Sequence, residues 1–189
     1  MKKNEALISR YVLDHGNSLL TNVTVVGCAV VILSLMAQVS IPLPFTPVPI
    51  TGQTFAVSFL ALMLGRKLGT SSVFAYLLVG AAGLPVFAAG KSSLGGPTTG
   101  YLVGMLLGTW IMGTLSDRGC TKSFIKTFLV SYIGSVCVFG YGLLILSLFI
   151  PHEGLFVAGL YPFLFGDFLK NILATTLVTK TNNFFGGQS

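Results

Sequence analysis

Charged residues are scarce in this sequence: aspartate, glutamate, lysine and arginine together make up only 8% of 189 residues. A soluble domain averages about 25% charged residues, so this chain could not build a water-soluble surface. Hydrophobic residues make up 53% of the chain, and the mean hydropathy is +0.85. The composition therefore predicts an integral membrane protein whose main environment is the lipid bilayer.

Residues that carry catalytic or metal chemistry are also few. The three cysteines, Cys28, Cys120 and Cys137, are odd in number and widely spaced, which argues against a disulfide framework. The two histidines, His15 and His152, lie far apart and have no cluster of cysteines or carboxylates around them, so we expect no metal site. The sequence offers no serine–histidine or paired-carboxylate arrangement. We therefore expect no enzyme, no catalytic residue and no cofactor.

Six apolar stretches separated by short polar loops predict an all-α membrane protein, with six transmembrane helices in a compact bundle. A helix needs about 20 apolar residues to cross the membrane, and six such spans leave no room for a soluble domain. We therefore expect a single membrane domain, 1–189, with a cytoplasmic N-terminal segment, 1–18, and a flexible C-terminal tail, 181–189. The expected spans are 19–41, 51–64, 68–87, 99–115, 127–150 and 156–178.

The loop between the first two expected spans, Ile41 to Thr51, contains four prolines. Prolines at this density cannot continue a helix. The span that follows is short, because 14 residues rise only about 21 Å against a hydrocarbon core of about 30 Å. Irregular backbone at membrane depth is tolerated only where it is buried in protein or lines a cavity. We therefore expect the proline-rich loop to lie beside a cavity.

Basic residues alternate between the two sides of the expected spans. Nine of the eleven lie in the N-terminal segment, in the second-to-third and fourth-to-fifth loops, or after the last span, which all share one side. The opposite side has only Lys91, and Lys170 lies inside a span. Loops rich in lysine and arginine face the cytoplasm, which predicts a cell-membrane protein with both termini cytoplasmic. The net charge of +6 therefore does not require a nucleic-acid partner.

Asp167 and Lys170 lie inside the last expected span, three positions apart, where two side chains share a helix face. Ionisable residues in a membrane usually face a cavity and mark a substrate site. Two interpretations stay open: a ligand site, with the carboxylate accepting N–H groups and the lysine donating to a carbonyl, or a structural ion pair. Thr51 and Gln53 also have two interpretations, as contacts to an amide-like or urea-like ligand or as a helix cap and a polar contact to the loop.

A glycine-rich loop, 88–100, precedes the fourth expected span. Gly95 to Thr99 lead into a helix N-terminus, whose free N–H groups favour a carboxylate, and Lys91 would add a positive charge. Alternatively, Lys91 is a solvated external side chain. Gly90, Lys91 and Ser92 resemble the end of a phosphate-binding loop, but the earlier glycine of that motif is missing. We therefore expect no nucleotide site here.

Glycines recur every four residues in the fourth expected span, at Gly100, Gly104 and Gly108. Small residues allow close approach of helices in lipid. This stripe predicts either packing inside the bundle or a docking surface for a partner protein. Small residues of the first span, such as Ala29, offer a second candidate face.

Five sequence segments occur in order along the chain: PVPITGQT, LGRKLG, YLLVGAAGLPVFA, GGPTTGYLVG and PFLFGDFLK. Together they resemble the BioY family, the biotin-specific substrate-binding (S) components of energy-coupling factor (ECF) transporters, over about Pro44 to Lys170. The resemblance implies a six-helix membrane protein that captures biotin from the external side for ATP-driven uptake. It also implies a transmembrane coupling subunit and two cytoplasmic ATPase subunits as partners.

The same resemblance implies ligand-binding residues at the motif positions, and these extend the candidates drawn from chemistry alone. The ureido group of biotin suits Asp167, Lys170 and Gln53, and its carboxylate suits the glycine-rich loop and Lys91. Many relatives have a glycine-richer loop here, so the role of Lys91 stays open. A self-sufficient secondary transporter and an intramembrane enzyme are the alternatives. The full set of expected ligand-binding residues is Thr51, Gln53, Lys91, Gly96, Pro97, Thr98, Tyr101, Asp167 and Lys170.

Overall fold

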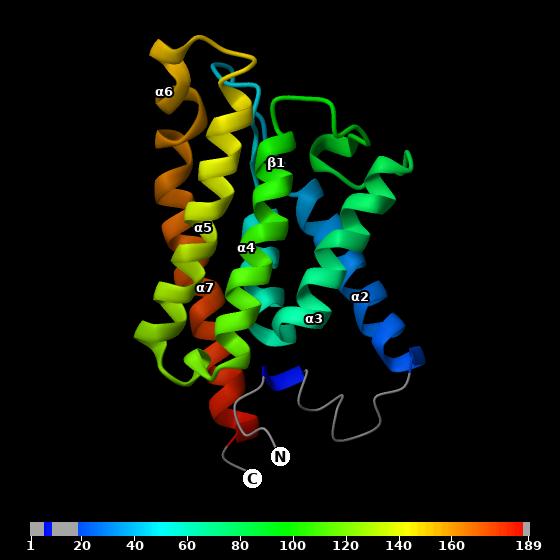
Figure 1. Ribbon diagram of the computed structural model, residues 1–189. Helices are drawn as coiled ribbons and strands as arrows, with labels where there is room; N and C mark the ends of the chain where they lie inside the picture. Colours follow the sequence, from blue (N-terminus) through cyan, green and yellow to red (C-terminus); the bar gives the residue numbers. More distant parts are fainter. Residues whose placement is uncertain (1–5, 9–18, 187–189) are drawn as a thin grey trace.

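The computed structural model describes residues 6–8 and 19–186, and this part of the chain is almost entirely helical (Figure 1). The expected N-terminal segment, 1–18, lies outside the described residues except for 6–8. Five helices of the described chain are 19 residues or longer: α2 (Leu19–Gln38), α3 (Gln53–Ala81), α4 (Thr99–Asp117), α5 (Phe124–Leu146) and α7 (Tyr161–Gly186). The shorter elements are β1 (Ser40–Ile41), β2 (Ile50–Thr51), α6 (Leu155–Gly159) and 3₁₀ turns at Ala88–Gly90, Cys120–Lys122 and His152–Gly154.

Helix α3 changes direction at Gly65, which has a φ of +72° and a ψ of −169°. This φ favours glycine, and a Cβ here would also overlap the Asp117 carboxylate. Asp117 Oδ2 accepts a hydrogen bond from the Arg66 backbone N–H at 2.9 Å, satisfying a donor at the start of the second arm. The two arms, 53–64 and 66–81, run in opposite directions (Figure 1). The expected break between the second and third spans thus falls at Gly65.

Three stretches of the described chain are long and apolar enough to cross a membrane: Leu19–Gln38, Phe124–Leu146 and His152–Phe184. They correspond to the first, fifth and sixth expected spans. The last stretch is broken near Leu160, between α6 and α7.

The first part of the tail expected from residue 181 is helical, because α7 continues to Gly186. Flexibility of this tail stays a prediction. Asn182 Nδ2 donates to the Thr121 carbonyl oxygen at 3.1 Å, which connects the end of α7 to the turn before α5. Thr181 Oγ1 donates back to the Leu177 carbonyl oxygen at 2.7 Å, within the helix. Residues 187–189 lie outside the described range.

The glycine stripe of α4 packs against α5 inside the molecule. A Cβ on Gly104 would lie 2.7 Å from Val138 Cα, and one on Gly108 would lie 3.0 Å from the Gly134 carbonyl oxygen. Only glycine permits this approach, so the stripe serves internal packing. Its interpretation as a partner-docking surface is wrong, because these glycines are buried. Ala29 on α2 is also buried, at 2% exposure, so it offers no open face either.

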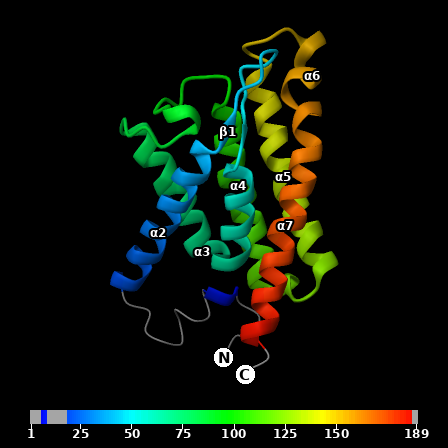
Figure 2. The same ribbon diagram turned by 180° about the vertical axis from the view of Figure 1, so that it is seen from behind.

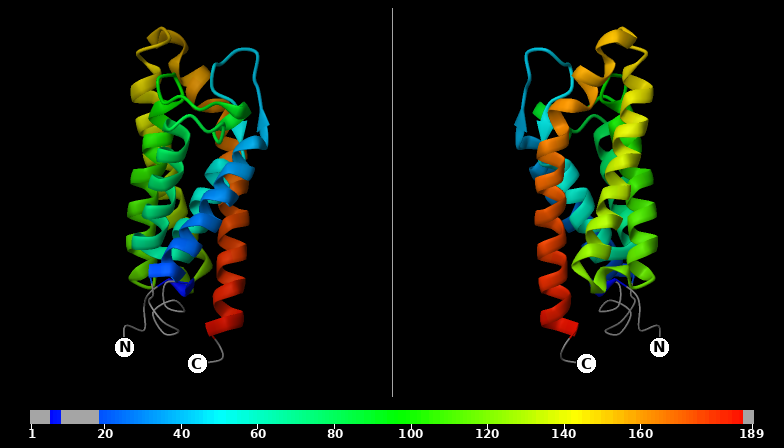
Figure 3. Two further views of the ribbon diagram at one scale, coloured as in Figure 1. Left: turned by 90° about the vertical axis from the view of Figure 1, so that its right-hand side faces the viewer. Right: turned by 90° about the vertical axis from the view of Figure 1, so that its left-hand side faces the viewer.

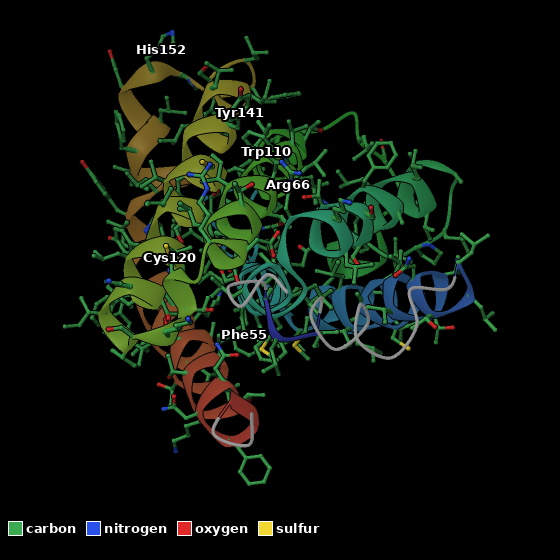
Figure 4. The ribbon with its side chains drawn as sticks, turned by 60° about the horizontal axis from the view of Figure 1, so that its bottom comes forward. Phe55, Arg66, Trp110, Cys120, Tyr141 and His152 are labelled. Atoms are coloured by element: carbon green, nitrogen blue, oxygen red, sulfur yellow. The ribbon has the colours of Figure 1, made fainter. Side chains whose placement is uncertain are left out.

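The connections between helices gather at two opposite ends of the molecule (Figures 1 and 2). The start of α2, the turn at Gly65, the α4–α5 turn and the end of α7 lie at the lower end in Figure 1. The β1–β2 hairpin, the loop before α4 and the turn before α6 lie at the upper end. Figure 4 labels His152 of the upper end and Cys120 of the lower end. Six of the nine basic residues that share one side in the sequence lie within the described ranges, and their turns and helix ends are at this lower end: Arg66, Lys67, Arg118, Lys122, Lys126 and Lys180.

Candidate functional site

A cavity opens between the helices near the upper end, below the hairpin and the loop before α4. The space unoccupied by atoms, with the open solvent at its mouth included, is about 750 Å³. Helices α3, α4, α5 and α7 and both loops contribute to its wall. The lining residues are Val48, Pro49, Thr51, Gln53, Thr54, Phe87, Ala88, Lys91, Ser93, Thr98, Tyr101, Leu102, Met105, Val138, Phe139, Phe163, Asp167 and Lys170.

The proline-rich loop forms one part of this wall. Its ends are paired as antiparallel strands, with Ser40 opposite Thr51 and Ile41 opposite Ile50. Residues 42–49 therefore form a closed loop, which lies near the loop that precedes α4 (Figure 3). Val48 and Pro49 line the cavity. The expectation that this loop lies beside a cavity is confirmed.

Lys170 connects α7 to the start of α3. Its Nζ donates to the Thr51 carbonyl oxygen at 2.6 Å and to Thr54 Oγ1 at 3.1 Å. An ammonium group has three donors, so these two bonds leave one donor for another partner. The lysine is positioned by two neutral oxygens, one from Thr51 of β2 and one from Thr54 of α3. Sequence analysis missed Thr54. The signal available in the sequence was a hydroxyl side chain directly after Gln53, a residue already expected at the site.

Asp167 is buried, at 5% exposure, and is held by its own helix. Its Oδ2 accepts a hydrogen bond from Asn171 Nδ2 at 2.9 Å, and the same nitrogen donates to Ser135 Oγ on α5, also at 2.9 Å. Within the described part of the chain, no hydrogen bond joins Asp167 to Lys170, although their charges attract each other. The two charges therefore line the cavity as neighbours, each with its own neutral partners.

Gln53 lies in the cavity wall but is largely engaged by protein groups. Its Nε2 donates to Tyr76 Oη at 2.6 Å, and its Oε1 accepts from Thr51 Oγ1 at 3.2 Å. Tyr76 in turn donates to the Val86 carbonyl oxygen at 3.0 Å. This chain of bonds fastens the start of α3 to its second arm and to the loop beyond. The interpretation of Thr51 as the helix cap is wrong, because the N-cap of α3 is Gly52 and no side chain caps it. The Thr51 hydroxyl instead accepts a hydrogen bond from the Gln53 backbone N–H at 3.3 Å.

Three aromatic rings form an apolar part of the wall. Tyr101 of α4, Phe139 of α5 and Phe163 of α7 pack around one another, with each pair of ring centroids 6.4 Å apart. The Tyr101 hydroxyl donates to the Gly159 carbonyl oxygen at 2.7 Å, at the end of α6. Tyr101 therefore offers the cavity its ring. Sequence analysis missed the two phenylalanines because 15 are spread along this apolar chain.

The glycine-rich loop contributes Lys91, Ser93 and Thr98 to the lining, while Gly96 and Pro97 lie outside it. The Gly96 N–H donates to Thr99 Oγ1 at 3.0 Å, and that hydroxyl donates to the Leu94 carbonyl oxygen. These two bonds shape the loop that leads into α4. Seven of the nine expected residues thus surround one cavity, with Gly96 and Pro97 as the exceptions.

The sequence as a whole matches one family of proteins. The BioY family model covers residues 4–187. The chain belongs to the BioY family. This membership confirms the resemblance drawn from the five sequence segments, and with the apolar helices it shows a multi-pass membrane protein.

Relatives of this BioY protein cover most of its length. It is 34% identical over 158 residues to the biotin transporter BioY of Thermotoga maritima, spanning 82% of this chain and 91% of that one. It is 33% identical over 161 residues to the probable biotin transporter BioY of Pyrococcus horikoshii, spanning 84% of this chain and 94% of that one. Its fold is similar to the crystal structure of the S-component for biotin from an ECF-type ABC transporter. That match has a TM-score of 0.80 and 27% identity, and it covers 89% of this chain and 94% of the other.

Proposed function

We propose that this BioY protein is the S component of an ECF transporter and that its ligand is biotin. One observation carries the proposal: a buried carboxylate, Asp167, and an ammonium group, Lys170, lie beside three aromatic rings in one cavity. Biotin has the matching chemistry, with a polar ureido group on a compact apolar ring system. A mostly apolar pocket with a few convergent polar groups is the usual form of a small-molecule site.

The ureido group pairs with the two charged residues. Asp167 accepts hydrogen bonds from the ureido N–H groups, and the remaining donor of Lys170 binds the ureido oxygen. Hydrogen bonds to charged groups contribute about 1.5–3 kcal/mol each. Because both side chains are already held by Asn171 and Thr54, little ordering is required when the ligand binds.

The rest of the ligand meets the apolar wall and the mouth of the cavity. The bicyclic body packs on Tyr101, Phe139 and Phe163, which also exclude water from the polar contacts. The valerate chain extends toward the loop before α4. There Lys91 and Thr98 bind its carboxylate, since Lys91 supplies a full positive charge and Thr98 directly precedes the start of α4.

The chain crosses the membrane six times in this proposal. The passes are α2, the two arms of α3, α4, α5, and α6 together with α7. The end with the turns at Gly65 and Cys120–Lys122 faces the cytoplasm, because basic residues are retained on that side. Both termini are then cytoplasmic, and the cavity opens toward the outside of the cell, where the vitamin is captured.

Energy for uptake comes from partner proteins. The sequence has no acceptable phosphate-binding loop. A transmembrane coupling subunit and two cytoplasmic ATPase subunits therefore complete the transporter. A self-sufficient secondary transporter is less favoured, because such proteins are often built from internal repeats and none is evident in this sequence.

Calorimetric titration of the purified protein tests the ligand assignment. We expect one biotin to bind per chain, with no heat from other vitamins of similar size. Heat with another vitamin and none with biotin would contradict the assignment. Uptake of labelled biotin by cells should become ATP-dependent when the coupling subunit and ATPases are co-expressed, with the lone chain as the control.

A further inference from the structure

Phe87 is a buried residue of the loop between α3 and α4, at 3% exposure, and it lines the cavity. Its ring packs edge-on against Tyr76 of α3, with the ring centroids 5.3 Å apart and an angle of 79° between the planes. One turn further along α3, a Cβ on Gly80 would overlap the Phe87 ring, so only glycine leaves room for it. The ring of Phe87 thus fills a slot on the buried face of α3 and fastens the loop to that helix.

The backbone of Phe87 is held as firmly as its ring. Its N–H donates to the Lys91 carbonyl oxygen at 2.9 Å, and its carbonyl oxygen accepts a hydrogen bond from the Gly90 N–H at 3.1 Å. From the end of α2, Gln38 Nε2 donates to the same Phe87 oxygen at 3.1 Å. Residues 87–91 therefore form a closed turn, which we call the 87–91 turn, with Phe87 as its anchor.

The 87–91 turn contains a backbone conformation that is unfavourable for its sequence. Ala89 has a φ of +56° and is the only non-glycine residue with a positive φ in the described part of the chain. Such conformations persist only where the surrounding structure over-determines them, and they cluster at ligand clamps and active sites. The contacts of Phe87 supply this constraint, because they close the turn on both sides of Ala89. The turn is therefore held in one shape by its anchor.

The 87–91 turn ends at Lys91, an exposed residue that also lines the cavity. Among the described residues, no hydrogen bond or ion pair engages the ammonium group of Lys91. Lys170, the other basic residue of the cavity, is already bonded to Thr51 and Thr54. Lysine has a flexible four-carbon stem, so the direction of an unbonded ammonium group depends on the backbone that carries it.

We propose that Phe87 is a positioning residue, which anchors the 87–91 turn and so directs Lys91 toward the carboxylate of the ligand. The proposal rests on the proposed function, since the carboxylate is that of biotin. A fixed turn lowers the cost of ordering the lysine when the ligand binds. Gly80 and Gln38 act through Phe87: Gly80 makes room for the ring, and Gln38 holds the carbonyl oxygen.

Calorimetric titration with biotin and with biotinamide, whose carboxamide carries no charge, measures recognition of the carboxylate. An exposed ion pair contributes little, so the wild type should bind biotin about fivefold more tightly than the amide. Lys91→Gln should abolish this preference. Phe87→Ala removes the anchor, and Gly80→Ala displaces its ring from a position outside the cavity lining. Each should lower the preference to less than about twofold.

A double variant shows whether the anchor and the lysine act on one contact. If Gly80→Ala acts only by misdirecting Lys91, adding Lys91→Gln to it should bring the preference to that of Lys91→Gln alone. Independent effects would instead multiply.

Matched controls are available on α5. Phe139 also lines the cavity, so Phe139→Ala should weaken both ligands by the same factor and leave the fivefold preference unchanged. Gly140→Ala is the control for Gly80→Ala, because a Cβ on Gly140 would meet no atom within 4 Å. Its two affinities should equal those of the wild type.

Two results would overturn the proposal while biotin still binds. Equal affinity of the wild type for biotin and biotinamide would show that Lys91 does not recognise the carboxylate. A fivefold preference retained by Phe87→Ala and Gly80→Ala would show that the anchor does not position the lysine. A wild type that binds neither compound would contradict the ligand assignment itself, and this proposal with it.

Discussion

Asn171 donates a hydrogen bond to the Asp167 carboxylate at 2.9 Å from one turn further along α7. The same nitrogen reaches Ser135 Oγ on α5 at 2.9 Å, and Asn171 is only 1% exposed. A buried neutral amide, fixed between two helices, therefore sets the direction of the carboxylate. This preorganisation lowers the ordering cost of any ligand that bonds to Asp167.

Replacing Asp167 with asparagine should weaken biotin binding without unfolding the protein. The amide can still bond to Asn171, but it loses the charge that strengthens hydrogen bonds to the ureido N–H groups. Such bonds contribute about 1.5–3 kcal/mol, so affinity should fall roughly 10- to 150-fold, as measured by calorimetry. Size-exclusion chromatography is the control. A variant that fails to accumulate as a monodisperse protein would indicate a structural role for Asp167.

Replacing Thr54 with valine should weaken biotin binding by a smaller factor. The variant keeps the side-chain shape but removes one of the two acceptors that position Lys170 Nζ. A hydrogen bond contributes about 0.5–1.5 kcal/mol, which corresponds to a loss of about 2- to 12-fold. Thr176→Val is the matched control, because the Thr176 hydroxyl donates only to its own helix, at the Ile172 carbonyl oxygen. Equal affinities for the two variants would exclude a positioning role for Thr54.

Much of this fold could be predicted from apolar stretches and helix-breaking residues. The sequence predicted a break near Gly65 because polar residues interrupt the hydrophobicity there, and the structure places a non-helical glycine at that point. The end of α7 could not be predicted in the same way. Its last turns are anchored by Asn182 on the Thr121 carbonyl oxygen, and a long-range contact to a backbone atom leaves no local sequence signal.

The candidate site was only partly predictable, for a related physical reason. Asp167 and Lys170 stood out because charges are costly in a membrane. Their partners, Asn171, Thr54 and the Thr51 carbonyl oxygen, are a neutral amide, a hydroxyl and a backbone group, which are common and carry no such signal. The glycine stripe of α4 was ambiguous because close packing inside a bundle and docking of a partner require the same small residues.

Impermeant thiol labelling of whole cells tests the orientation of the chain. The first variant has its three native cysteines replaced and carries His152→Cys as its single cysteine. This cysteine should be labelled, because the exposed position lies at the end proposed to face outside. A second variant retains Cys120 as its single cysteine, at the opposite end of the molecule. This cysteine should be labelled only after the cells are permeabilised. The reverse pattern would mean that the basic end faces outward and that the proposed topology is inverted.

Replacing Gly104 with alanine should destabilise the bundle itself. The added Cβ would lie 2.7 Å from Val138 Cα and 2.8 Å from the Cys137 carbonyl oxygen, and backbone atoms cannot rotate away as a side chain can. Overpacking of this kind costs about 1–3 kcal/mol, so the thermal unfolding temperature in detergent should fall.

Gly140→Ala on α5 is the matched control, because its Cβ would meet no atom within 4 Å. Alanine is also the better helix former by about 0.5–1 kcal/mol, so this control should be as stable as the wild type or slightly more so. If the two variants unfolded at the same temperature, α4 and α5 would have room to separate, and the close packing of the stripe would not be needed for stability.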